Sequence, residues 1–474
     1  MNQSVQNKLS NVQVDNKLTK DAVDFAVSSG LLLKSRNESG KVVGYKHVPF
    51  VLFPTIISKD SLEFLSQIQS DFNTLMHVVV QDQQFLIDSL EGVADEFTQR
   101  LLHIFKEVIA SERSMPPELA YVRSDYMFDF DPISGTAPPK QIEINTMSVS
   151  FGGIGTQKMC DIHKRVLGKA NLPDLVLQLP QNPANQKVAE GFVKAWKLYG
   201  NPNAAMIFLL GDFETNTYDQ RAFEYAINNI NPEIKIKGVK FSSLPGRTQL
   251  SNDGTFFIDG EEVGLLYFRA AFQPHHYASE EIWKIRKDME FSRAIKCPSV
   301  GQQLFGSKKM QEIFARKGVV EQFVGETAAA NIRRTFSGLY SLEMNEEGDS
   351  VVKMAIENSQ KYVLKPQREG GGNNIYGEDI AKLLREIGND SRRSAYILMD
   401  LINPKPTPNY AICGGTATKE EVVSELGIYG VYLACGDKML ENYAAGHLLR
   451  SKPKDQNDGG VATGVAMLDS PLLV

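Results

Sequence analysis

The sequence predicts a mixed α/β fold of two to three structural units, and three observations carry this prediction. The chain has 474 residues, whereas a typical domain has roughly 150. Hydrophobic residues make up 42% and charged residues 23%, which is the balance of a globular protein with a large core. Helix-period segments come first, and helix-period and strand-period segments then alternate along the rest of the chain.

The first part of the chain predicts two amphipathic helices followed by strands. Apolar residues recur every three or four positions from Leu62 to Leu75 and again from Leu90 to Val108, which is the helical period. Residues 120–127 and 140–146 are rich in β-branched and aromatic residues and predict strands. A further helix stripe over residues 188–199 ends at Gly200, a typical helix terminator.

A second unit begins after Asn201-Pro202-Asn203. The apolar run 205–210 predicts a strand buried on both faces, and the helix through Ala222 and the strand near 234–241 complete a βαβ unit. Asp259-Gly260 predicts a hairpin turn. We therefore expect domains at 1–201, 202–304 and 305–474, and the last contains predicted helices at 309–316 and 380–387 and strands at 362–365, 396–399 and 426–434.

Charge and cysteine content exclude several classes of protein. The 51 Lys and Arg against 57 Asp and Glu give a net charge of −6, so no basic field favours nucleic acid as a partner. The four cysteines lack zinc-site spacing and indicate a reduced compartment. Residues 1–20 are polar and no apolar run approaches the ~18 residues of a membrane span, so we expect a cytosolic protein with no membrane partner.

The most informative segment runs from Lys365 to Asn374 and contains Gly370, Gly371 and Gly372. Consecutive glycines reach positive φ and let backbone N–H groups approach a phosphate, while Lys365 supplies a positive charge and Glu369 a hard oxygen ligand. The segment therefore predicts phosphate and metal binding. A solvated surface hairpin is the alternative interpretation.

A second candidate metal-binding segment is the predicted strand Gln141-Ile142-Glu143-Ile144-Asn145. Its period of two places Glu143 and Asn145 on one face. A carboxylate and an amide oxygen suit Mg²⁺, and Glu369 could complete the site. The alternative is an ordinary amphipathic strand with its polar face in solvent.

Two further segments carry basic residues. Residues 301–308 nearly match a phosphate-binding P-loop, but Ser307 precedes Lys308 and we reject the motif, although a lysine at a helix start suits phosphate. Arg450 and Lys452 precede the glycine-rich residues 458–464, which predict a loop that closes over a substrate. The alternatives are an exposed lysine and a frayed terminal loop.

Four segments together resemble the eukaryotic glutathione synthetases over essentially the whole chain: Arg123 to Met127, Gln141 to Thr146, Lys365 to Asn374 and Ser424 to Gly427. The resemblance implies a permuted ATP-grasp architecture with a smaller inserted parallel-sheet substrate domain and a glycine-rich lid. It implies a cytosolic homodimer that uses ATP and Mg²⁺, with two ions per ATP. The implied reaction ligates γ-glutamylcysteine with glycine through an acyl phosphate, giving glutathione, ADP and phosphate.

The resemblance also implies roles for individual residues. Catalytic roles fall to Lys365 and Arg450, and the implied magnesium ligands are Glu143, Asn145 and Glu369. The implied ATP contacts are Glu143, Lys308, Lys365, Gly370, Gly371, Gly372, Asn373, Asn374, Tyr376, Met399, Asp400, Leu401, Ile402, Glu425, Lys452 and Asp458. The implied substrate contacts are Arg123, Met147, Ser148, Val149, Ser150, Glu214, Thr215, Asn216, Gln220, Arg269, Arg450, Val461 and Ala462.

The chain departs from the family pattern at three places: Thr215, Ala270-Ala271-Phe272 and Thr463. The first two bear on dipeptide contacts, and Thr463 bears on the preference for glycine. An alternative function is therefore a related synthetase with another acceptor, such as β-alanine or serine. A non-catalytic nucleotide-binding protein is a third interpretation, but no implied metal ligand or phosphate lysine is missing.

Overall fold

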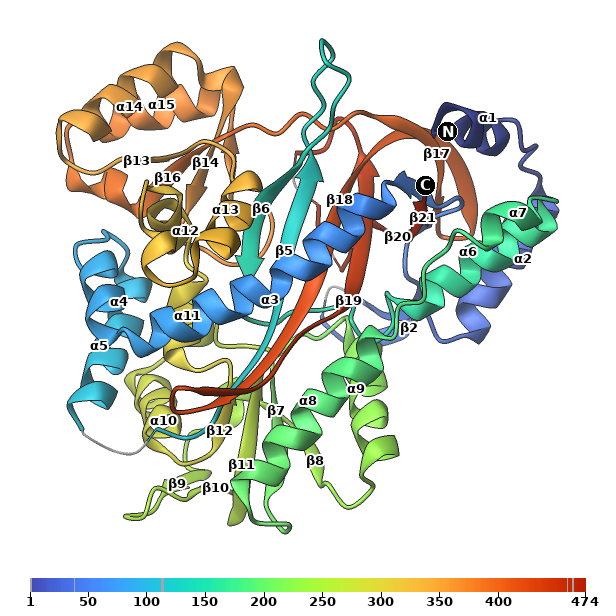
Figure 1. Cartoon of the computed structure of the whole chain (residues 1–474). Coiled ribbons are helices and arrows are strands. Elements are labelled where there is room, and N and C mark those ends of the chain that lie inside the picture. The colour runs from blue at the N-terminus through green and yellow to red at the C-terminus, as the bar shows by residue number, and fades with distance from the viewer. Residues whose placement is uncertain (1, 38, 112–114, 458, 463) are drawn as a thin grey trace.

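The computed structural model describes residues 2–37, 39–111, 115–457, 459–462 and 464–474, which form a mixed α/β molecule (Figure 1). Its central element is a seven-stranded sheet with strand order β17-β3-β20-β19-β18-β5-β6. The strands of this sheet are β3 (Phe50–Val51), β5 (Glu118–Phe128), β6 (Pro139–Asn145), β17 (Thr407–Cys413), β18 (Thr416–Cys435), β19 (Lys438–Pro453) and β20 (Met467–Asp469).

The long strand β18 organises the central sheet because it is apolar on both faces. It pairs antiparallel with β19 on one side and with β5 on the other. Ile428 and Tyr432 pack into one hydrophobic core with the helix α3 (Lys59–Gln81), whereas Tyr429 and Val431 pack into a second core with α8 (Ala184–Tyr199). The sheet is thus covered on both sides, with α3 crossing one face and α8 the other (Figure 1).

A second sheet of six strands follows the order β8-β7-β11-β10-β9, and β12 pairs with β11. The predicted βαβ unit is present, since β7 and β8 are parallel and α9 connects them. Strands β7, β8, β11 and β12 run parallel, while β10 pairs antiparallel with both β11 and β9. The elements are β7 (Ala205–Leu210), α9 (Thr217–Ile230), β8 (Ile236–Lys240), β9 (Thr248–Leu250), β10 (Phe256–Ile258), β11 (Glu261–Phe268), α10 (Glu280–Phe291) and β12 (Ile295–Cys297).

A four-stranded antiparallel sheet with the order β13-β16-β14-β15 forms a separate lobe with two helices. Figure 1 shows this lobe at the upper left, beside the ends of β5 and β6. Its elements are β13 (Leu339–Ser341), α14 (Glu346–Glu357), β14 (Tyr362–Pro366), β15 (Ile375–Tyr376), α15 (Glu378–Ile387) and β16 (Tyr396–Asp400). The predicted glycine-rich lid connects β14 to β15.

The remaining elements surround these sheets. Two small sheets pair β1 (Leu32–Arg36) with β2 (Val42–His47) and β4 (Thr55–Ile57) with β21 (Pro471–Leu473). The other α-helices are α1 (Asn2–Ser10), α2 (Asn16–Ser28), α4 (Gln83–Leu90), α5 (Glu96–Ala110), α6 (Gln157–Lys169), α7 (Pro173–Val176), α11 (Val300–Phe305), α12 (Lys308–Ala315) and α13 (Glu326–Arg334). Short 3₁₀ helices are η1 (Phe241–Ser243), η2 (Pro274–His276), η3 (Val320–Gln322), η4 (Ser359–Lys361) and η5 (Ser391–Ala395).

The structure corrects one predicted helix. The apolar stripe from Leu90 to Val108 is not continuous, because α4 ends at Leu90 and α5 begins at Glu96. The Asp95 side chain accepts a hydrogen bond from Thr98 N at 2.9 Å and caps the new helix. The N-cap Asp95 therefore starts a new helix within a stretch whose apolar period predicted a continuous one. The predicted end of α8 is confirmed, since Gly200 is left-handed with a φ of 87°.

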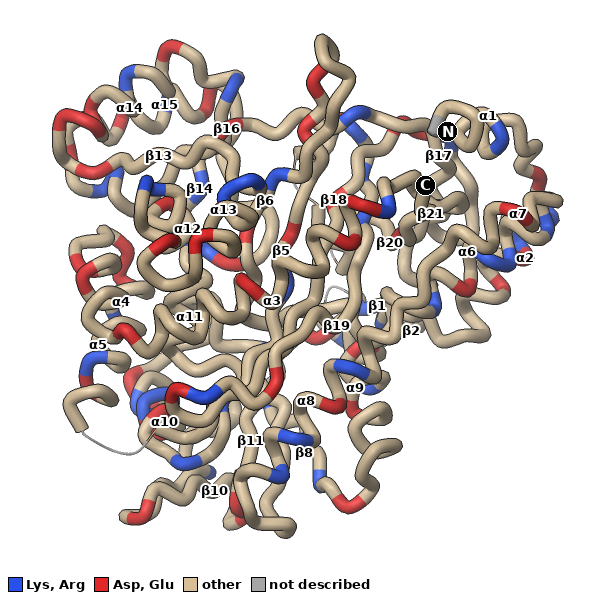
Figure 2. Tube along the Cα trace, viewed as in Figure 1, with Lys and Arg blue, Asp and Glu red and all other residues tan. Residues whose placement is uncertain are grey.

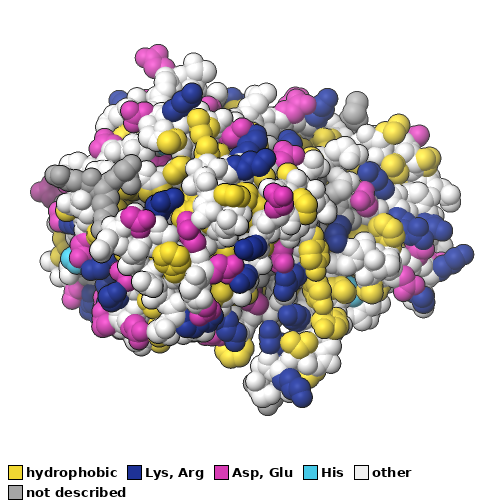
Figure 3. All heavy atoms as spheres, turned by 90° about the horizontal axis from the view of Figure 1, so that it is seen from below, with side chains coloured by type: hydrophobic (Ala, Val, Ile, Leu, Met, Phe, Trp, Pro, Cys, Tyr) yellow, Lys and Arg dark blue, Asp and Glu magenta, His cyan; other side chains and the backbone are white. Residues whose placement is uncertain are grey.

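Charges of both signs are distributed over the molecule. Figure 2 shows Lys and Arg interspersed with Asp and Glu along the trace, and the face in Figure 3 mixes the two signs as well. This agrees with the small net charge of −6. Over the described ranges, no helix has the length and apolar character needed to cross a membrane.

Candidate active site

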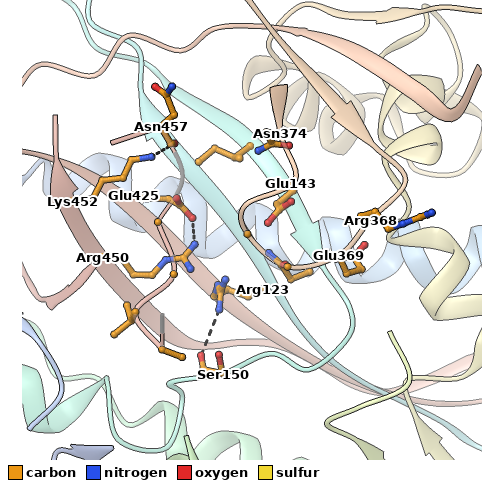
Figure 4. A pocket seen from close by; sticks show the side chains of 18 of the residues that line it. Arg123, Glu143, Ser150, Arg368, Glu369, Asn374, Glu425, Arg450, Lys452 and Asn457 are labelled. Carbon is orange, nitrogen blue, oxygen red and sulfur yellow. Dashed lines mark hydrogen bonds and ion pairs between the residues drawn. The ribbon is translucent and has the colours of Figure 1, made fainter. Parts of the chain in front are cut away.

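A cavity of about 960 Å³ lies where the central sheet, the six-stranded sheet and the lid lobe meet (Figure 4). The strands β5 and β6 supply its floor through Arg123, Glu143 and Asn145. The lid segment after β14 contributes Glu369 and Gly370, and the loops after β6, β7 and β11 form the opposite wall. Residues far apart in the sequence therefore converge on one chamber.

The lysine Lys308 lies between two carboxylates in this cavity. Its Nζ is 2.9 Å from Glu143 Oε2 and 3.6 Å from Glu369 Oε1. Lys308 is the first residue of α12, which the Ser307 side chain caps by accepting from Met310 N at 3.4 Å. Its side chain is only 5% exposed, so this cation is held away from bulk water.

Burial and charge act in opposite directions on this cluster. Burial alone would lower the pKa of Lys308, but Glu143 and Glu369 outweigh burial and raise it. Burial would raise the pKa of Glu143, yet Lys308 and Lys365 lower it below its usual range. Burial raises the pKa of Glu369. Lys308 thus stays protonated and Glu143 ionised near neutral pH.

Lys365 lies near the end of β14 and is directed toward β6. Its Nζ donates to the carbonyl oxygen of Ile142 at 2.7 Å, and its side chain is buried. The glycine-rich turn follows directly, and Gly370 and Gly372 have φ values of 87° and 88°, which non-glycine residues rarely adopt. Gln273 Nε2 donates to Glu369 O at 3.3 Å, so the lid contacts the loop after β11.

A buried aspartate, Asp125, joins three strands at the cavity floor. It accepts from Arg123 Nε at 2.5 Å and Nη2 at 2.7 Å, from Asn145 Nδ2 at 2.9 Å and from Arg450 Nη2 at 3.2 Å. Arg450 also donates to Glu425 on β18. Burial alone would lower the pKa of Arg123, but Asp125 raises it well above its usual value.

The guanidinium fork of Arg123 is therefore occupied by Asp125. Only Nη1 turns elsewhere, toward Ser150 O at 3.5 Å (Figure 4). Sequence reasoning assigned this arginine to the substrate. Arg450 contacts both Asp125 and Glu425 through its Nη2 atom, so neither of these ion pairs is bidentate.

The segment after β6 is tied to the loops of the six-stranded sheet. Asp219, in the first turn of α9, accepts from the backbone N–H groups of Phe151, Gly153 and Ile154 at 2.7–3.0 Å. Ser148 Oγ donates to Arg269 O at 3.1 Å, and Arg269 Nη1 donates to the carbonyl of Val149. These bonds tie the segment after β6, which contains the predicted substrate-binding residues 147–150, to the start of α9 and to the residue that follows β11.

The loop after β7 presents an unsatisfied amide to the cavity. The Oδ1 and Nδ2 atoms of Asn216 are buried and have no hydrogen-bond partner in the described part of the chain, although the residue lines the cavity. A buried polar group without a partner is costly, so this side chain is suited to a polar ligand. Glu214 beside it accepts from Gln220 Nε2 at 2.8 Å.

The structure brings most predicted site residues to this cavity. Those that line it are Arg123, Glu143, Asn145, Met147, Ser148, Val149, Ser150, Glu214, Thr215, Asn216, Arg269, Lys308, Lys365, Glu369, Gly370, Gly371, Asn374, Tyr376, Met399, Asp400, Leu401, Ile402, Glu425, Arg450, Lys452, Val461 and Ala462. Gly372, Asn373 and Gln220 are not among the lining residues. Asp458 and Thr463 lie outside the described residues.

Sequence reasoning missed several residues that organise the site. Asp125 had a usable signal, because it shares a strand face with Arg123. Asp219 had none, since an acidic residue in the first turn of a helix is ordinary. Arg368 pairs with Asp95 at the start of α5 and also lines the cavity, and Gln273 contacts the lid, although neither contact has a local sequence pattern.

The oxygen ligands of the cavity are few. Among the described residues, no group of three or more His, Cys, Asp and Glu side chains could hold a metal ion. Glu143 and Glu369 nevertheless both lie beside Lys308 Nζ. Asn145 uses its Nδ2 for the hydrogen bond to Asp125, so its side-chain oxygen could serve as a further metal ligand. This set resembles a Mg²⁺ site, which needs only one or two protein carboxylates and keeps several waters.

Comparisons with known proteins agree with this geometry. The family model described as "Eukaryotic glutathione synthase, ATP binding domain" matches residues 13–473. The glutathione synthetase of Bos taurus is 40% identical over 462 residues, covering 96% of each chain, and that of Homo sapiens is 39% identical with the same coverage. A chloroplastic glutathione synthetase of Solanum lycopersicum is 38% identical and covers 97% of this chain and 84% of that protein.

The fold also has a solved counterpart. A glutathione synthetase-like effector, GSS30 from Globodera pallida, superposes with a TM-score of 0.78 at 22% sequence identity. The match covers 98% of this chain and 99% of that one. At this identity the likeness shows a shared fold alone.

Proposed function

The chain belongs to the eukaryotic glutathione synthetase family, and we propose that its cavity ligates γ-glutamylcysteine with glycine at the expense of ATP. It is an ATP-dependent ligase with a permuted ATP-grasp fold. The observation that carries the proposal is the cluster of Lys308, Glu143 and Glu369 beneath the glycine-rich lid. The cluster offers a cation and two carboxylates at one point, as phosphoryl transfer requires.

We propose that Glu143, Asn145 and Glu369 hold Mg²⁺ together with the phosphates of ATP. Bound there, the ion would neutralise phosphate charge during transfer. Lys308 now holds the two carboxylates together and would turn to a phosphate oxygen when they bind the metal. Lys365, fixed by the Ile142 carbonyl, is aimed at the same region.

The protein's part in the reaction is positioning and electrostatic stabilisation. A carboxylate is a poor electrophile, so the cysteinyl carboxylate takes the γ-phosphoryl group of ATP and becomes an acyl phosphate. The glycine amine then attacks, the amide bond forms and phosphate leaves. We propose that Lys308, Lys365 and Arg450, which line the cavity, stabilise the developing negative charge, so no covalent nucleophile of the protein is needed.

The dipeptide is proposed to lie on the side of the six-stranded sheet. Asn216 offers a buried donor and acceptor, and Arg269 and residues 147–150 form the adjoining wall. Val461 and Ala462 line the cavity beyond Arg450, and we propose that they cover the glycine end. The adenine would lie between Tyr376 and the segment 399–402 of the lid lobe.

We further propose that the chain acts as a cytosolic homodimer with domains 1–201, 202–304 and 305–474. The six-stranded sheet, which spans residues 205–297, would be the inserted substrate domain. The glycine-rich turn between β14 and β15 would be the lid.

The test is ADP release coupled to product identification. The purified protein is given ATP, Mg²⁺ and γ-glutamylcysteine with glycine, β-alanine or serine, and the product mass is measured. We expect ADP release that depends on the dipeptide and is fastest with glycine. Faster use of β-alanine or serine would assign the chain to the alternative acceptor, and ADP release that needs no dipeptide would refute the ligase.

A further inference from the structure

The hairpin β1–β2, near the N-terminus, contacts the loop that carries Asn216. The two strands form a small sheet of their own, apart from the sheets that build the cavity. Figure 2 shows β1 and β2 beside α9, and β1 packs against that helix. The loop between β7 and α9 therefore has a neighbour that comes from about 180 residues earlier in the chain.

Two hydrogen bonds join the hairpin to this loop. The backbone N–H of Lys34 donates to the carbonyl of Thr215 at 3.1 Å. Arg36 Nη2 donates to the carbonyl of Glu214 at 3.0 Å, and its Nη1 donates to the carbonyl of Gly40 at 2.6 Å. One guanidinium thus closes the hairpin turn and holds the loop at the same time.

The bonds fall on the two residues that precede Asn216. The Glu214 carbonyl accepts from Arg36 and from Thr217 Oγ1 at 3.3 Å, which fixes the peptide plane at the start of α9. Asn216 itself has no side-chain capping bond, so its orientation depends on the backbone around it. That backbone is held on one side by Arg36.

We propose that Arg36 is a positioning residue for the dipeptide: it fixes the Glu214 peptide and thereby directs the Asn216 amide into the cavity. The inference rests on the proposed function, because it assumes that Asn216 binds γ-glutamylcysteine. Arg36 does not line the cavity, so it acts only through the loop. A lysine cannot replace it fully, because one ammonium does not span two carbonyls as the guanidinium fork does.

The chemistry predicts a selective defect. Removing the guanidinium frees the Glu214 carbonyl from the hairpin and leaves only the Lys34 backbone bond to the loop, while Lys308, Lys365 and the nucleotide side stay unchanged. The Michaelis constant for γ-glutamylcysteine should then rise by about 10-fold, the effect of one lost hydrogen bond from a charged donor. The Michaelis constant for ATP and kcat should change by less than about twofold.

The experiment compares Arg36→Gln and Arg36→Lys with the wild-type enzyme in steady-state kinetics, with each substrate varied in turn. The matched control is Lys46→Gln, which removes a positive charge from an exposed position of the same hairpin and should behave as wild type. Arg36→Lys should lie between wild type and Arg36→Gln. In a third variant, Arg36→Ala, the Michaelis constant for γ-glutamylcysteine should also rise, and added guanidinium should lower it again without altering the control.

A folded Arg36→Gln enzyme with an unchanged Michaelis constant for γ-glutamylcysteine would overturn the proposal. So would equal rises for ATP and the dipeptide, or a loss confined to kcat. If Arg36→Gln does not fold, Arg36→Lys decides by the same criteria. Glutathione formation by wild type and Lys46→Gln tests the proposed function separately, so a failure of one inference is distinguishable from a failure of the other.

Discussion

Neutralising either carboxylate beside Lys308 should nearly abolish ligation while the fold survives. In Glu143→Gln and Glu369→Gln the side-chain shape is kept and one negative charge is lost. The charges lie 2.9 Å and 3.6 Å from Lys308 Nζ, so their attraction to it is about 6 and about 5 kcal/mol at an effective dielectric constant near 20. The two variants should therefore behave alike.

The expected loss follows from what each charge does in the reaction. Removing one preorganised electrostatic contact typically lowers kcat by about 10²–10³, or roughly 3–4 kcal/mol of transition-state stabilisation. Loss of a carboxylate ligand should also raise the Mg²⁺ concentration needed for half-maximal rate. Stability should fall by only about 1–3 kcal/mol, because Lys308 keeps its second carboxylate.

Glu343 provides a matched control, because it pairs with Lys309, the residue next to Lys308 in α12. It pairs with Lys309 and with Arg316 at 3.2 Å but does not line the cavity. Glu343→Gln should leave ADP release and its Mg²⁺ dependence unchanged. ADP release by folded Glu143→Gln and Glu369→Gln within about threefold of wild type would refute the role of this cluster.

Three further predictions follow from particular residues. Asn216→Ala should raise the Michaelis constant for γ-glutamylcysteine by about 10- to 100-fold without lowering the melting temperature, because its polar atoms have no partner among the described residues; a destabilised variant with unchanged kinetics would contradict this. Arg123→Lys should impair use of the dipeptide more than use of ATP, since lysine cannot grip Asp125 with two bonds; an effect confined to the Michaelis constant for ATP would assign Arg123 to the nucleotide. Burial lowers the pKa of His447 to about 4, so the stability it contributes is present above its unfolded pKa of about 6.5 and is lost, up to about 3 kcal/mol, as pH falls to about 4. The free energy of unfolding of His447→Phe, measured in urea, should fall less steeply with decreasing pH than that of the wild type. An unchanged pH dependence would show that this histidine does not contribute to the loss of stability in acid.

The sequence predicted the elements that repeat a simple pattern. The apolar run of β7, the α8 stripe ending at Gly200 and the Asp259-Gly260 turn are local, and each appears where expected. The strand predicted over 426–434 is only the C-terminal part of β18, which begins at Thr416, before the apolar stretch. Pairing with β17 and β19 decides that length, and pairing partners cannot be read from a local pattern.

The candidate site was likewise predictable only where a local sequence pattern determines the geometry. Glu143 and Asn145 share a face because strands alternate, so their convergence was predictable. A shared strand face also placed Arg123 beside Asp125, but it did not decide whether the Arg123 guanidinium binds Asp125 or a substrate. Contacts such as Arg36 with Glu214 join segments that only the tertiary fold brings together, and no spacing rule reaches across them.

The order of strands in the central sheet has a consequence for biosynthesis. β5 is its first long strand to be made, but its neighbour β18 begins about 300 residues later, and β20 and β21 pair with β3 and β4 from near the start of the chain. At a synthesis rate of about 5–20 residues per second, β5 waits on the order of 15–60 s for its partner. The nascent chain therefore exposes an apolar strand on the ribosome until synthesis is nearly complete, and we expect its yield to depend on chaperones that cover such strands.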